Sequence, residues 1–576
     1  MAIELSNVTF TEQNDIVPPS GVEPILNTGI ANTLAGNDLI TGTWTIISEF
    51  FSYPGNSLGA IIGFYNTGTL NTADGNDKIT GAIIENQDLG GYFRGAFVNE
   101  GGTIDTDDGN DIITGTYNEN IDFYGISYGI FNTAGGTIDT GNGNDTITGI
   151  TKWGGGLSVY SGSIITGNGN DIITGIADSN FGGSGLSVSI DGNIDTGSGN
   201  DIITGTGIAG IQNESTITTD NGNDIITGAG TSDRGILNSS FTTKDILRRR
   251  GVINTGDGND IIIGTSTDNN GIENRNRFSI IDTGSGNDVI NGLGSIGIYN
   301  EGTINTGNGQ DSIISGGSFI NYGEVFLGDG NDSISVDGSS DDGALVNYDT
   351  IETGDGNDII TGIDYIGINN LGIINTGNGE DSIISEGNFI NRDRVFLGDG
   401  NDSINAYGLD NFNTIETGEG DDIITGTGVI YNEGVINTGD GNDSIIVDGG
   451  TDDITGTSYG IYNNGGAINM GDGNDSIIAN EGFESGPNSS GAWFLGEGDD
   501  YIKGFGSGDF YGGNGNDTLE LTPGTYTVGI WGEAGESPIF TKGDQLMITS
   551  EFEQLKAGGT TYDFASLTAG QIIVVA

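Results

Sequence analysis

A short turn of sequence G-x-G-N-D recurs along most of the chain and limits the possible folds more than any other feature. The stretch TGNGNDTITG, from Thr140 to Gly149, is one copy, and alternating apolar residues follow each copy. Successive copies begin 17 to 39 residues apart. A repeat this short cannot bury an apolar face alone, so the pattern predicts a solenoid in which each coil packs on its neighbours. The aspartates of the copies are Asp38, Asp77, Asp111, Asp145, Asp171, Asp201, Asp224, Asp260, Asp288, Asp311, Asp332, Asp358, Asp381, Asp402, Asp422, Asp443, Asp475, Asp500 and Asp517.

A second repeated position, an asparagine, lies upstream of many of these aspartates. Asn27, Asn66, Asn213, Asn300, Asn321, Asn347, Asn370, Asn391 and Asn432 each precede their aspartate by 11 residues. Asn99, Asn132, Asn274, Asn413 and Asn463 fit within three residues of that spacing. Insertions therefore fall mainly between one aspartate and the next asparagine. We interpret the asparagine either as a stacked hydrogen-bonded ladder at a corner or as a ligand-binding residue.

The residue two positions before the asparagine is apolar and is predicted to form the core. These residues are Ile25, Phe64, Phe97, Ile130, Ile211, Ile236, Ile272, Ile298, Phe319, Leu345, Ile368, Phe389, Ile430 and Ile461. The position between them varies, from Tyr65 and Tyr299 to Gln212 and Glu273, and is expected to face outward. Alternation with a period of two indicates strands rather than helices.

These patterns predict an all-β chain, an elongated parallel β-solenoid of the β-roll or β-helix kind with a small C-terminal β-rich cap. Glycine makes up 109 of the 576 residues, yet 34% are apolar and regularly placed, which favours an ordered β-protein over a disordered tract. We expect residues 1–30 to form an N-terminal cap or donor strand, 31–521 the solenoid, and 522–576 the cap.

The charge of the chain limits its partners. Acidic residues number 81 against 15 basic ones, a net charge of −66. Such a chain repels itself unless cations neutralise it, and it lacks the basic surface that nucleic acids require. It has no histidine and no cysteine, so the commonest general base, thiolate metal sites and disulfides are excluded. No apolar run approaches the length of a membrane-spanning helix, and no Sec-type signal opens the chain.

The repeat resembles the RTX, or hemolysin-type, calcium-binding nonapeptide G-G-x-G-x-D-x-U-x. In the copy that runs from Thr140 to Thr148, only the first glycine of the motif is replaced, and Gly141, Gly143, Asp145 and Ile147 match. The resemblance spans about Leu34 to Leu521. It implies that the repeated aspartates, together with loop carbonyls, hold Ca²⁺ between successive coils. About eighteen Ca²⁺ ions would supply a charge of roughly +36, which would neutralise over half of the net charge of −66.

Departures from the motif qualify this implication. Leu34, Ala73, Asp107 and Asp220 replace the first glycine before Asp38, Asp77, Asp111 and Asp224, so these four sites are expected to be weaker or altered. Gln310, Glu380, Asp421 and Asp499 replace the asparagine of the turn, which suggests that its side chain is not essential. Each coil holds one such turn, which predicts a single calcium column opposite an asparagine corner.

The two ends and one insertion carry further expectations. The segment from residue 522 resembles the C-terminal regions of RTX proteins exported by type I secretion, particularly cyanobacterial ones, and reads as several strands with a short amphipathic helix near EFEQLKAGG. The resemblance implies an extracellular or cell-surface protein. Seven of the 15 bases lie between Arg234 and Arg277, namely Arg234, Lys244, Arg248, Arg249, Arg250, Arg275 and Arg277. They either pair with nearby acids or contact the acidic face of another copy.

We predict that the chain is not an enzyme, since the repeat accounts for nearly all of its carboxylates. The leading hypothesis is a secreted calcium-stabilised structural protein that self-assembles into filaments, fibrils or a surface layer, with head-to-tail stacking of coils as one route. The alternative is a monomeric adhesin that binds cell-surface glycans through insertions around residues 43–63, 82–96 and 176–190. The aromatic residues there are Trp44, Phe50, Phe51, Tyr53, Tyr92 and Phe93.

Overall fold

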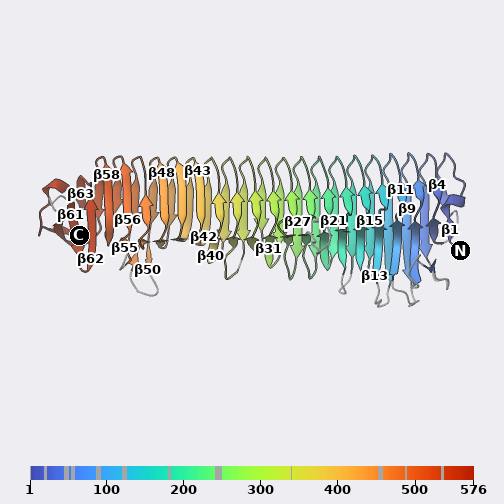
Figure 1. Ribbon diagram of the computed structural model, residues 1–576, viewed down its shortest axis with the longest axis horizontal. Coiled ribbons are helices and arrows are strands. Elements are labelled where there is room, and N and C mark those ends of the chain that lie inside the picture. The colour runs from blue at the N-terminus through green and yellow to red at the C-terminus, as the bar shows by residue number, and fades with distance from the viewer. Residues whose placement is uncertain are drawn as a thin grey trace. The chain divides into compact units, whose positions relative to one another are not determined.

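The computed structural model describes residues 2–18, 23–44, 51–52, 59–85, 93–119, 126–178, 183–239, 250–338, 340–451, 458–486, 490–532 and 537–576. The chain divides into two compact units, residues 1–317 and 318–576, each of which is described by itself. Both units are stacks of β-coils (Figure 1). The predicted fold class, a parallel β-solenoid with a β-rich C-terminal cap, is confirmed.

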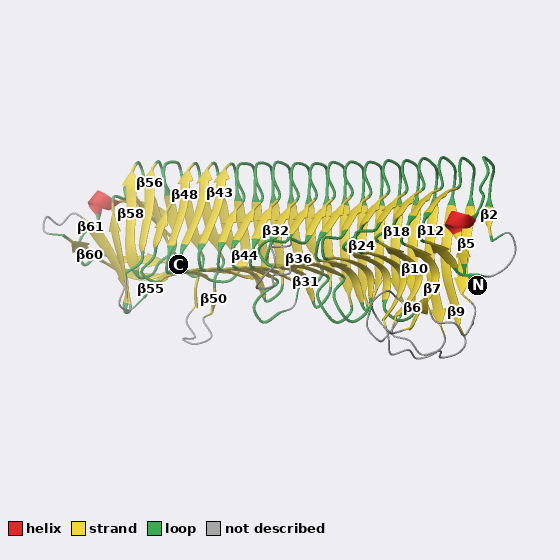
Figure 2. Ribbon diagram, turned by 45° about the vertical axis from the view of Figure 1, so that its right-hand side comes forward, coloured by secondary structure: helices red, strands yellow, loops and turns green. Residues whose placement is uncertain are grey.

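Each coil places one strand in each of three rows. The chain runs along a strand that ends at or just after the corner position, which asparagine occupies in most coils (the asparagine row). It then turns into a short strand of mostly three residues (the short row), passes through the G-x-G-N-D turn, and enters the strand that follows the aspartate (the aspartate row). Within each unit the turns form a regular series along one edge, and the longer, irregular connections lie on the opposite side (Figure 2).

In unit 1 the asparagine row comprises β3 Ile25–Asn27, β7 Gly59–Asn66, β10 Phe93–Glu100, β13 Ile126–Thr133, β16 Gly155–Tyr160, β19 Ser184–Ser189, β22 Ala209–Asn213, β25 Ile236–Ser239, β28 Ile272–Arg275 and β31 Ile296–Asn300. The short row comprises β4 Ile30–Asn32, β8 Thr69–Asn71, β11 Thr103–Asp105, β14 Thr137–Asp139, β17 Ser163–Ile165, β20 Asn193–Asp195, β23 Thr216–Thr218, β26 Val252–Asn254, β29 Ile280–Asp282 and β32 Thr303–Asn305. The aspartate row comprises β5 Leu39–Trp44, β9 Lys78–Glu85, β12 Ile112–Glu119, β15 Thr146–Thr151, β18 Ile172–Ala177, β21 Ile202–Gly207, β24 Ile225–Gly230, β27 Ile261–Ser266, β30 Val289–Leu293 and β33 Ser312–Ser315.

In unit 2 the asparagine row comprises β34 Ser318–Asn321, β37 Leu345–Asn347, β40 Ile366–Asn370, β47 Ile430–Asn432, β52 Ile461–Asn463 and β55 Phe483–Ser485. The short row comprises β35 Glu324–Phe326, β38 Thr350–Glu352, β41 Ile373–Asn375, β43 Arg394–Asp399, β45 Thr414–Glu419, β48 Val435–Asp440, β53 Ala467–Asn469, β56 Ala492–Glu497 and β58 Gly508–Asn514. The aspartate row comprises β36 Ser333–Asp337, β39 Ile359–Ile363, β46 Ile423–Gly426, β49 Ser444–Val447, β54 Ser476–Ala479, β57 Tyr501–Lys503 and β59 Thr518–Leu521. Two longer strands, β42 Ser382–Asn391 and β44 Ser403–Asn411, run through the aspartate row and on into the asparagine row.

Strands within a row pair in parallel, so equivalent side chains of successive coils stack. Each coil contributes one buried apolar residue from each row to the core. In one coil these are Ile130, Ile138 and Ile147, all completely buried. Burial of such a side chain is worth about 2 kcal/mol. The fourteen residues predicted as core two positions before the asparagine are all buried, which confirms that expectation.

The aspartate row and the asparagine row converge to backbone contact on the side of the insertions. A methyl group placed on Gly149 of β15 would lie 2.3 Å from the carbonyl oxygen of Gly156 in β16, and one on Gly175 would lie 2.1 Å from the oxygen of Gly185. Glycine therefore occupies this position, the fourth residue after the aspartate, in nine of the ten aspartate strands of unit 1, because a side chain would meet the facing backbone there. The core is consequently narrow at this side and wider near the G-x-G-N-D turn.

The N-terminal residues add a partial coil to unit 1. Strand β1 (Ile3–Glu4) pairs in parallel with β3, the single turn η1 (Leu5–Asn7) follows, and β2 (Ile16–Val17) pairs in parallel with β5. Strand β6 (Phe51–Ser52) is an antiparallel addition to β7. Residues 2–17 therefore lie on the first coil of their own chain.

The C-terminal residues cover the last coil of unit 2. Strands β60 Gly524–Trp531, β61 Ser537–Lys542 and β62 Gln545–Ser550 form an antiparallel meander, and β62 pairs with β58 of the short row. The remaining elements are β63 Gln554–Ala557, β64 Thr560–Asp563, the turn η2 Phe564–Ser566 and β65 Ile572–Val575. A separate two-stranded hairpin in unit 2 comprises β50 Gly450–Thr451 and β51 Ser458–Tyr459.

The helix predicted near EFEQLKAGG is wrong, because this segment is strand β63. Phe552, Leu555 and Ala557 are buried while Glu553 and Lys556 are exposed, which is close to the period of two of a strand. Strand β63 pairs in parallel with β59. The open edge of the last coil thus determines the local structure, since its backbone groups need partners.

Candidate metal column

The two glycines of each turn shape the backbone around the aspartate. In the turn that links β14 to β15, Gly141 and Gly143 have φ angles of +75° and +153°. Leu34, Ala73, Asp107 and Asp220, which replace the first glycine in four turns, keep the same left-handed conformation with φ between +55° and +68°. These four turns therefore retain the backbone of the motif, at a cost of about 1–2 kcal/mol for each side chain held there.

The aspartates of the turns form a continuous hydrogen-bonded column within each unit. The backbone N–H of one aspartate donates to the Oδ1 atom of the aspartate in the next coil, as from Asp111 to Asp145 at 2.7 Å and from Asp145 to Asp171 at 2.8 Å. The nineteen aspartates predicted from the sequence all occupy this position and are at most 2% exposed. The side chains therefore point into the turn rather than into solvent.

The second carboxylate oxygen of the column is buried and has no hydrogen-bond partner. This applies to the Oδ2 atoms of Asp38, Asp77, Asp111, Asp145, Asp171, Asp201, Asp224, Asp260, Asp288, Asp358, Asp381, Asp402, Asp422, Asp443, Asp475, Asp500 and Asp517. A buried acceptor without a partner costs about 1–3 kcal/mol, more when it is charged. One such atom in isolation would be a defect, but its repetition in coil after coil indicates a site for a ligand with positive charge.

Burial makes the ionised form of these carboxylates unfavourable. It raises the pKa of Asp77 to about 6 and those of Asp201 and Asp260 to about 7, from an ordinary 3.8, and neighbouring carboxylates of the column add to the effect. A threonine hydroxyl beside each of these carboxylates lowers the pKa by less than burial raises it. Beside Asp260 this hydroxyl, that of Thr255, donates its proton to the carbonyl of Thr283 in the next coil at 3.3 Å. Beside Asp77 and Asp201 the hydroxyls of Thr72 and Thr196 have no other acceptor and face the carboxylate.

Backbone carbonyls supply further oxygen atoms in the same turn. A methyl group on Gly143 would lie 1.4 Å from the carbonyl oxygen of Gly109, which shows that the carbonyl of the second glycine points along the column at the next coil. The carboxylate folds back over this glycine, since a methyl group on Gly109 would lie 3.1 Å from Oδ1 of Asp111. Among the described residues no group of three or more acidic side chains gathers at one point. A cation in this column would therefore need carbonyl oxygens as well as carboxylates.

The asparagine that precedes the aspartate forms a second, solvent-exposed ladder in the opposite direction. Its Oδ1 atom accepts the backbone N–H of the equivalent residue in the next coil, as Asn110 does from Asn144 at 2.7 Å. Asp421 and Asp499 accept the same bond, at 2.8 and 3.0 Å from Asn442 and Asn516. This side chain therefore has a structural role that the sequence did not reveal, and aspartate fills the same role at positions 421 and 499; that the asparagine is not essential stays a prediction.

The column begins and ends at residues that were not predicted. The backbone N–H of Asp15 donates to Oδ1 of Asp38 at 2.7 Å, and Asn14 accepts from the N–H of Asn37 at 2.9 Å, so Asn14 and Asp15 complete a further turn without glycine. The dipeptide N-D followed by isoleucine was the available signal. At the other end, Glu553 of the cap accepts the N–H of Asp517 at 2.7 Å, and no sequence pattern marks this residue.

The asparagines upstream of the turns form the predicted hydrogen-bonded ladder. Their Nδ2 atoms donate to the Oδ1 atom of the next coil at 2.8–3.0 Å, as from Asn321 to Asn347 at 2.8 Å, and they are completely buried. The ladder in unit 2 passes through Asn411 and not the predicted Asn413, because Asn411 keeps the spacing of 11 residues. Asn238 of unit 1, two residues after the predicted core residue Ile236, also belongs to the ladder, although an insertion places it 22 residues before the next aspartate, Asp260.

Part of the basic cluster pairs locally. Arg234 contacts Asp233 at 2.8 Å and Glu273 at 2.5 Å, and Arg275 lies 3.6 Å from Glu273. Glu273, predicted to face outward, is only 4% exposed because this pairing covers it. Lys244, Arg248 and Arg249 lie outside the described residues.

The aromatic residues proposed for adhesion are only partly described. Phe50, Tyr53 and Tyr92 lie outside the described residues, as do the side chains of Trp44 and Phe51. Phe93 packs against Tyr128 and Phe131, with ring centroids 5.9 and 5.7 Å apart. This residue therefore belongs to an aromatic cluster on the asparagine row.

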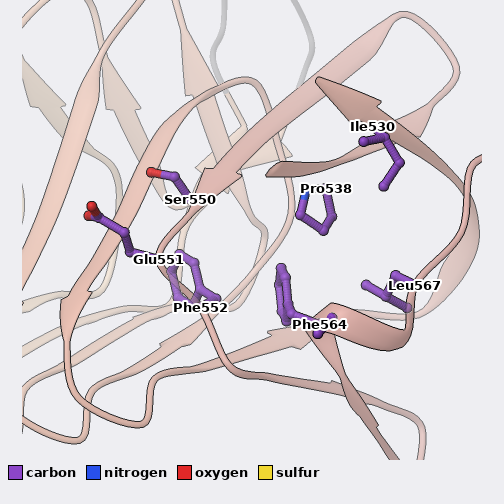
Figure 3. A pocket seen from close by; sticks show the side chains of 8 residues that line it. Ile530, Pro538, Ser550, Glu551, Phe552, Phe564 and Leu567 are labelled. Atoms are coloured by element: carbon purple, nitrogen blue, oxygen red, sulfur yellow. The ribbon is translucent and has the colours of Figure 1, made fainter. Parts of the chain in front are cut away.

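The cap of unit 2 contains a cavity of about 290 Å³ away from the column. Figure 3 shows Ile530, Pro538, Phe564 and Leu567 around it, while Glu551 is turned away. Six of its eight lining residues are apolar, and Ser550 and Glu551 are the two polar ones, so the lining offers no cluster of oxygen ligands. The cavity is thus unrelated to the repeated aspartates.

Comparisons with known proteins add little to this description. No helix among the described residues has both the length and the apolar character that crossing a membrane requires. No protein-family model matches the chain, and no curated protein matches it. One solved structure, a hyperactive, Ca²⁺-dependent, β-helical antifreeze protein from an Antarctic bacterium, is similar over 78% of this chain and 83% of its own, with 18% sequence identity and a TM-score of 0.23. A score this low means that the two chains do not superpose over the matched length.

Proposed function

We propose that this chain is a calcium-binding structural protein whose aspartate column holds Ca²⁺, with about one ion per coil. The observation that carries the proposal is the buried, unpartnered Oδ2 atom repeated along the column. An ion among these oxygens would remove the cost of burying each carboxylate and would bridge successive coils.

The chemistry of the turn favours Ca²⁺ over other cations. The site offers only oxygen atoms, from carboxylates and glycine carbonyls, and the chain contains neither histidine nor cysteine. Hard cations prefer oxygen ligands, and Ca²⁺ accepts six to eight of them in irregular geometry, whereas Mg²⁺ demands a near-ideal octahedron. The net charge of −66 supplies the long-range attraction for a series of divalent ions.

Calcium binding also accounts for how such a chain could be exported and then fold. Where Ca²⁺ is scarce, the buried carboxylates oppose folding, and the binding energy of the metal becomes folding energy where Ca²⁺ is abundant. We therefore propose an extracellular or cell-surface protein that folds after secretion and associates with copies of itself into filaments, fibrils or a surface layer. Residues 522–576 would serve both as cap and as the type I secretion signal region.

A second candidate is a monomeric calcium-dependent adhesin. The exposed pair Tyr322 and Tyr348 of unit 2 stack with ring centroids 4.3 Å apart and offer an aromatic surface to a glycan. Phe412, under Arg392, is a further exposed aromatic residue three coils from Tyr348. Electron microscopy of the calcium-loaded protein separates the two functions. Ordered assemblies support the structural role, and dispersed single particles support the adhesin.

The metal column is tested by two substitutions in one turn. Asp260 is buried in the column, whereas Asp257, three residues earlier, is exposed and makes no side-chain hydrogen bond among the described residues. Asp260→Asn keeps the oxygen that accepts the N–H of Asp224 at 2.8 Å but removes the charge. Asp257→Asn removes the same charge and introduces the residue found at this position in other turns, so it serves as the matched control.

We expect Asp260→Asn to bind about one Ca²⁺ fewer per chain than Asp257→Asn, by equilibrium dialysis with elemental analysis. In calcium, Asp260→Asn should melt at a lower temperature than Asp257→Asn. In chelator the order should reverse, because the substitution removes a buried charge. Equal calcium content in the two variants and the wild type would refute the proposal that the aspartate column binds Ca²⁺.

A further inference from the structure

The outward face of the aspartate row in unit 1 is uncharged from β12 to β33, whereas Lys78 lies on this side of the neighbouring strand β9. Its outward positions are the first, third and fifth residues after each column aspartate, from β12 to β33, and we call this surface the neutral face. None of these positions carries a charge, and most hold isoleucine or threonine. Ile112, Ile172, Ile202 and Leu293 are 37–40% exposed. We infer that the neutral face is the contact surface between two copies of this chain. The inference rests on the proposed self-association and specifies its surface.

Other surfaces of the protein are acidic. The outward positions of the short row in unit 1 include Asp105, Asp139, Asp195 and Asp282, and no base lies among them. The aspartate row of unit 2 carries Asp337, Glu386 and Asp448 on its outward side. Two copies with a net charge of −66 each repel one another where acidic faces meet. The neutral face allows close approach without burying a charge.

The size of the neutral face fits a specific contact. Eight strands about 4.8 Å apart, each with five residues at about 3.3 Å, project to roughly 600 Å² per copy and about 1,200 Å² for two. Specific interfaces bury upwards of about 1,000 Å². Strands β12 to β33 pair without a register shift, so the side chains form straight columns that can interdigitate with those of a second sheet about 10 Å away.

The ends of the solenoid are less suited to association than this face. At the N-terminal end, both carboxylate oxygens of Asp15 accept hydrogen bonds from Thr11, at 2.7 and 3.1 Å, and residues 2–17 cover the first coil. At the C-terminal end, Glu553 closes the aspartate column and the cap pairs with β58 and β59. Head-to-tail addition of strands would have to displace both coverings. Side-by-side contact needs no rearrangement.

The first test adds charge to the neutral face. Thr174 and Thr204 lie at equivalent outward positions of β18 and β21, whereas Thr216 faces outward from β23 in the short row. We expect the full chain in millimolar Ca²⁺ to associate in sedimentation velocity, the double variant Thr174→Glu, Thr204→Glu to stay monomeric, and Thr216→Glu to behave as wild type. Circular dichroism and bound calcium should be unchanged in all three, which separates loss of contact from loss of folding or of metal.

The second test uses the absence of cysteine from the chain. Single variants Thr174→Cys and Thr216→Cys are oxidised in calcium. We expect disulfide-linked dimers of Thr174→Cys but not of Thr216→Cys. The neutral face is not the contact surface if the double glutamate variant associates as strongly as wild type, or if both cysteine variants cross-link equally. Either result leaves the proposed calcium binding and self-assembly untouched. A wild-type chain that binds calcium yet stays monomeric at all concentrations overturns both the face and the proposed assembly.

Discussion

The buried carboxylates make the metal-free and calcium-loaded protein respond to pH in opposite directions. The pKa of Asp77 rises to about 6 and that of Asp201 to about 7, from 3.8. Between pH 3.8 and about 7, the folded metal-free chain therefore holds protons that the unfolded chain has released. Its free energy of unfolding must fall as the pH rises through this window and then become constant.

The magnitude follows from the size of the shift. At about 1.4 kcal/mol per pH unit, a pKa raised from 3.8 to about 6 corresponds to about 3 kcal/mol for one carboxylate. Neighbouring aspartates of the column titrate together, so their contributions do not simply add. Between pH 5 and pH 7.5 such a carboxylate contributes about 1.4 kcal/mol of that total. Because several carboxylates of the column titrate in this window, we expect the metal-free chain to have a free energy of unfolding at least about 3 kcal/mol higher at pH 5 than at pH 7.5.

The assay is urea unfolding followed by far-ultraviolet circular dichroism, on protein stripped of metal by dialysis against chelator and then transferred to metal-free buffers. If the stripped chain is unfolded at pH 7.5, a β-sheet signal should appear on acidification to pH 5. In millimolar Ca²⁺ the order reverses, because protons compete with the metal for the same oxygen atoms. A metal-free chain that is more stable at pH 7.5 than at pH 5 would refute the reasoning.

Three substitutions test the framework around the column by urea unfolding in calcium. Asn347→Ala removes a buried amide of the asparagine ladder and should cost about 3 kcal/mol, whereas Asn369→Ala, at a half-buried neighbouring position, should cost under about 1 kcal/mol. Gly149→Ala should lower the midpoint far more than Gly426→Ala at the equivalent position of unit 2, because the added methyl meets the facing glycine carbonyl in the first case and makes only ordinary van der Waals contacts in the second; equal midpoints would contradict the convergence of the two rows at Gly149. Arg234→Ala leaves its glutamate partner buried with a weaker contact and should cost about 3 kcal/mol; an unchanged midpoint would show that the ion pair is not structural.

The repeated elements of this fold could be predicted from the sequence because each repeated residue occupies the same structural position in every coil. Ile130 and its equivalents stand two positions before the asparagine corner in most coils, and their predicted burial is confirmed. The same regularity identified the asparagine corner. The error at Asn413 arose where two asparagines, two residues apart, both resemble the repeat, and only the ladder to the next coil selects Asn411.

The features that escaped prediction depend on contacts at the ends or across insertions. Asn14 and Asp15 join the column without the glycines that mark other turns, because they form its first rung and need no close approach from an earlier coil. Glu553 directly precedes β63, and the pairing of β63 with β59, which is distant from it in the sequence, brings Glu553 to the end of the column. Glu273 is buried by Arg234, which lies 39 residues earlier, a pairing that no local pattern encodes.

Within the G-x-G-N-D turns, the aspartates and the exposed asparagines that precede them form ladders of opposite direction, and this makes the turn modular. Within a unit, a coil offers one neighbour its aspartate oxygen and the other its asparagine oxygen, and receives the complementary bonds in return. A duplicated coil would therefore find both sets of partners wherever it was spliced in, and the chain can lengthen or shorten by whole coils without disturbing those that remain. Opening should proceed from the termini inward, as in a zipper.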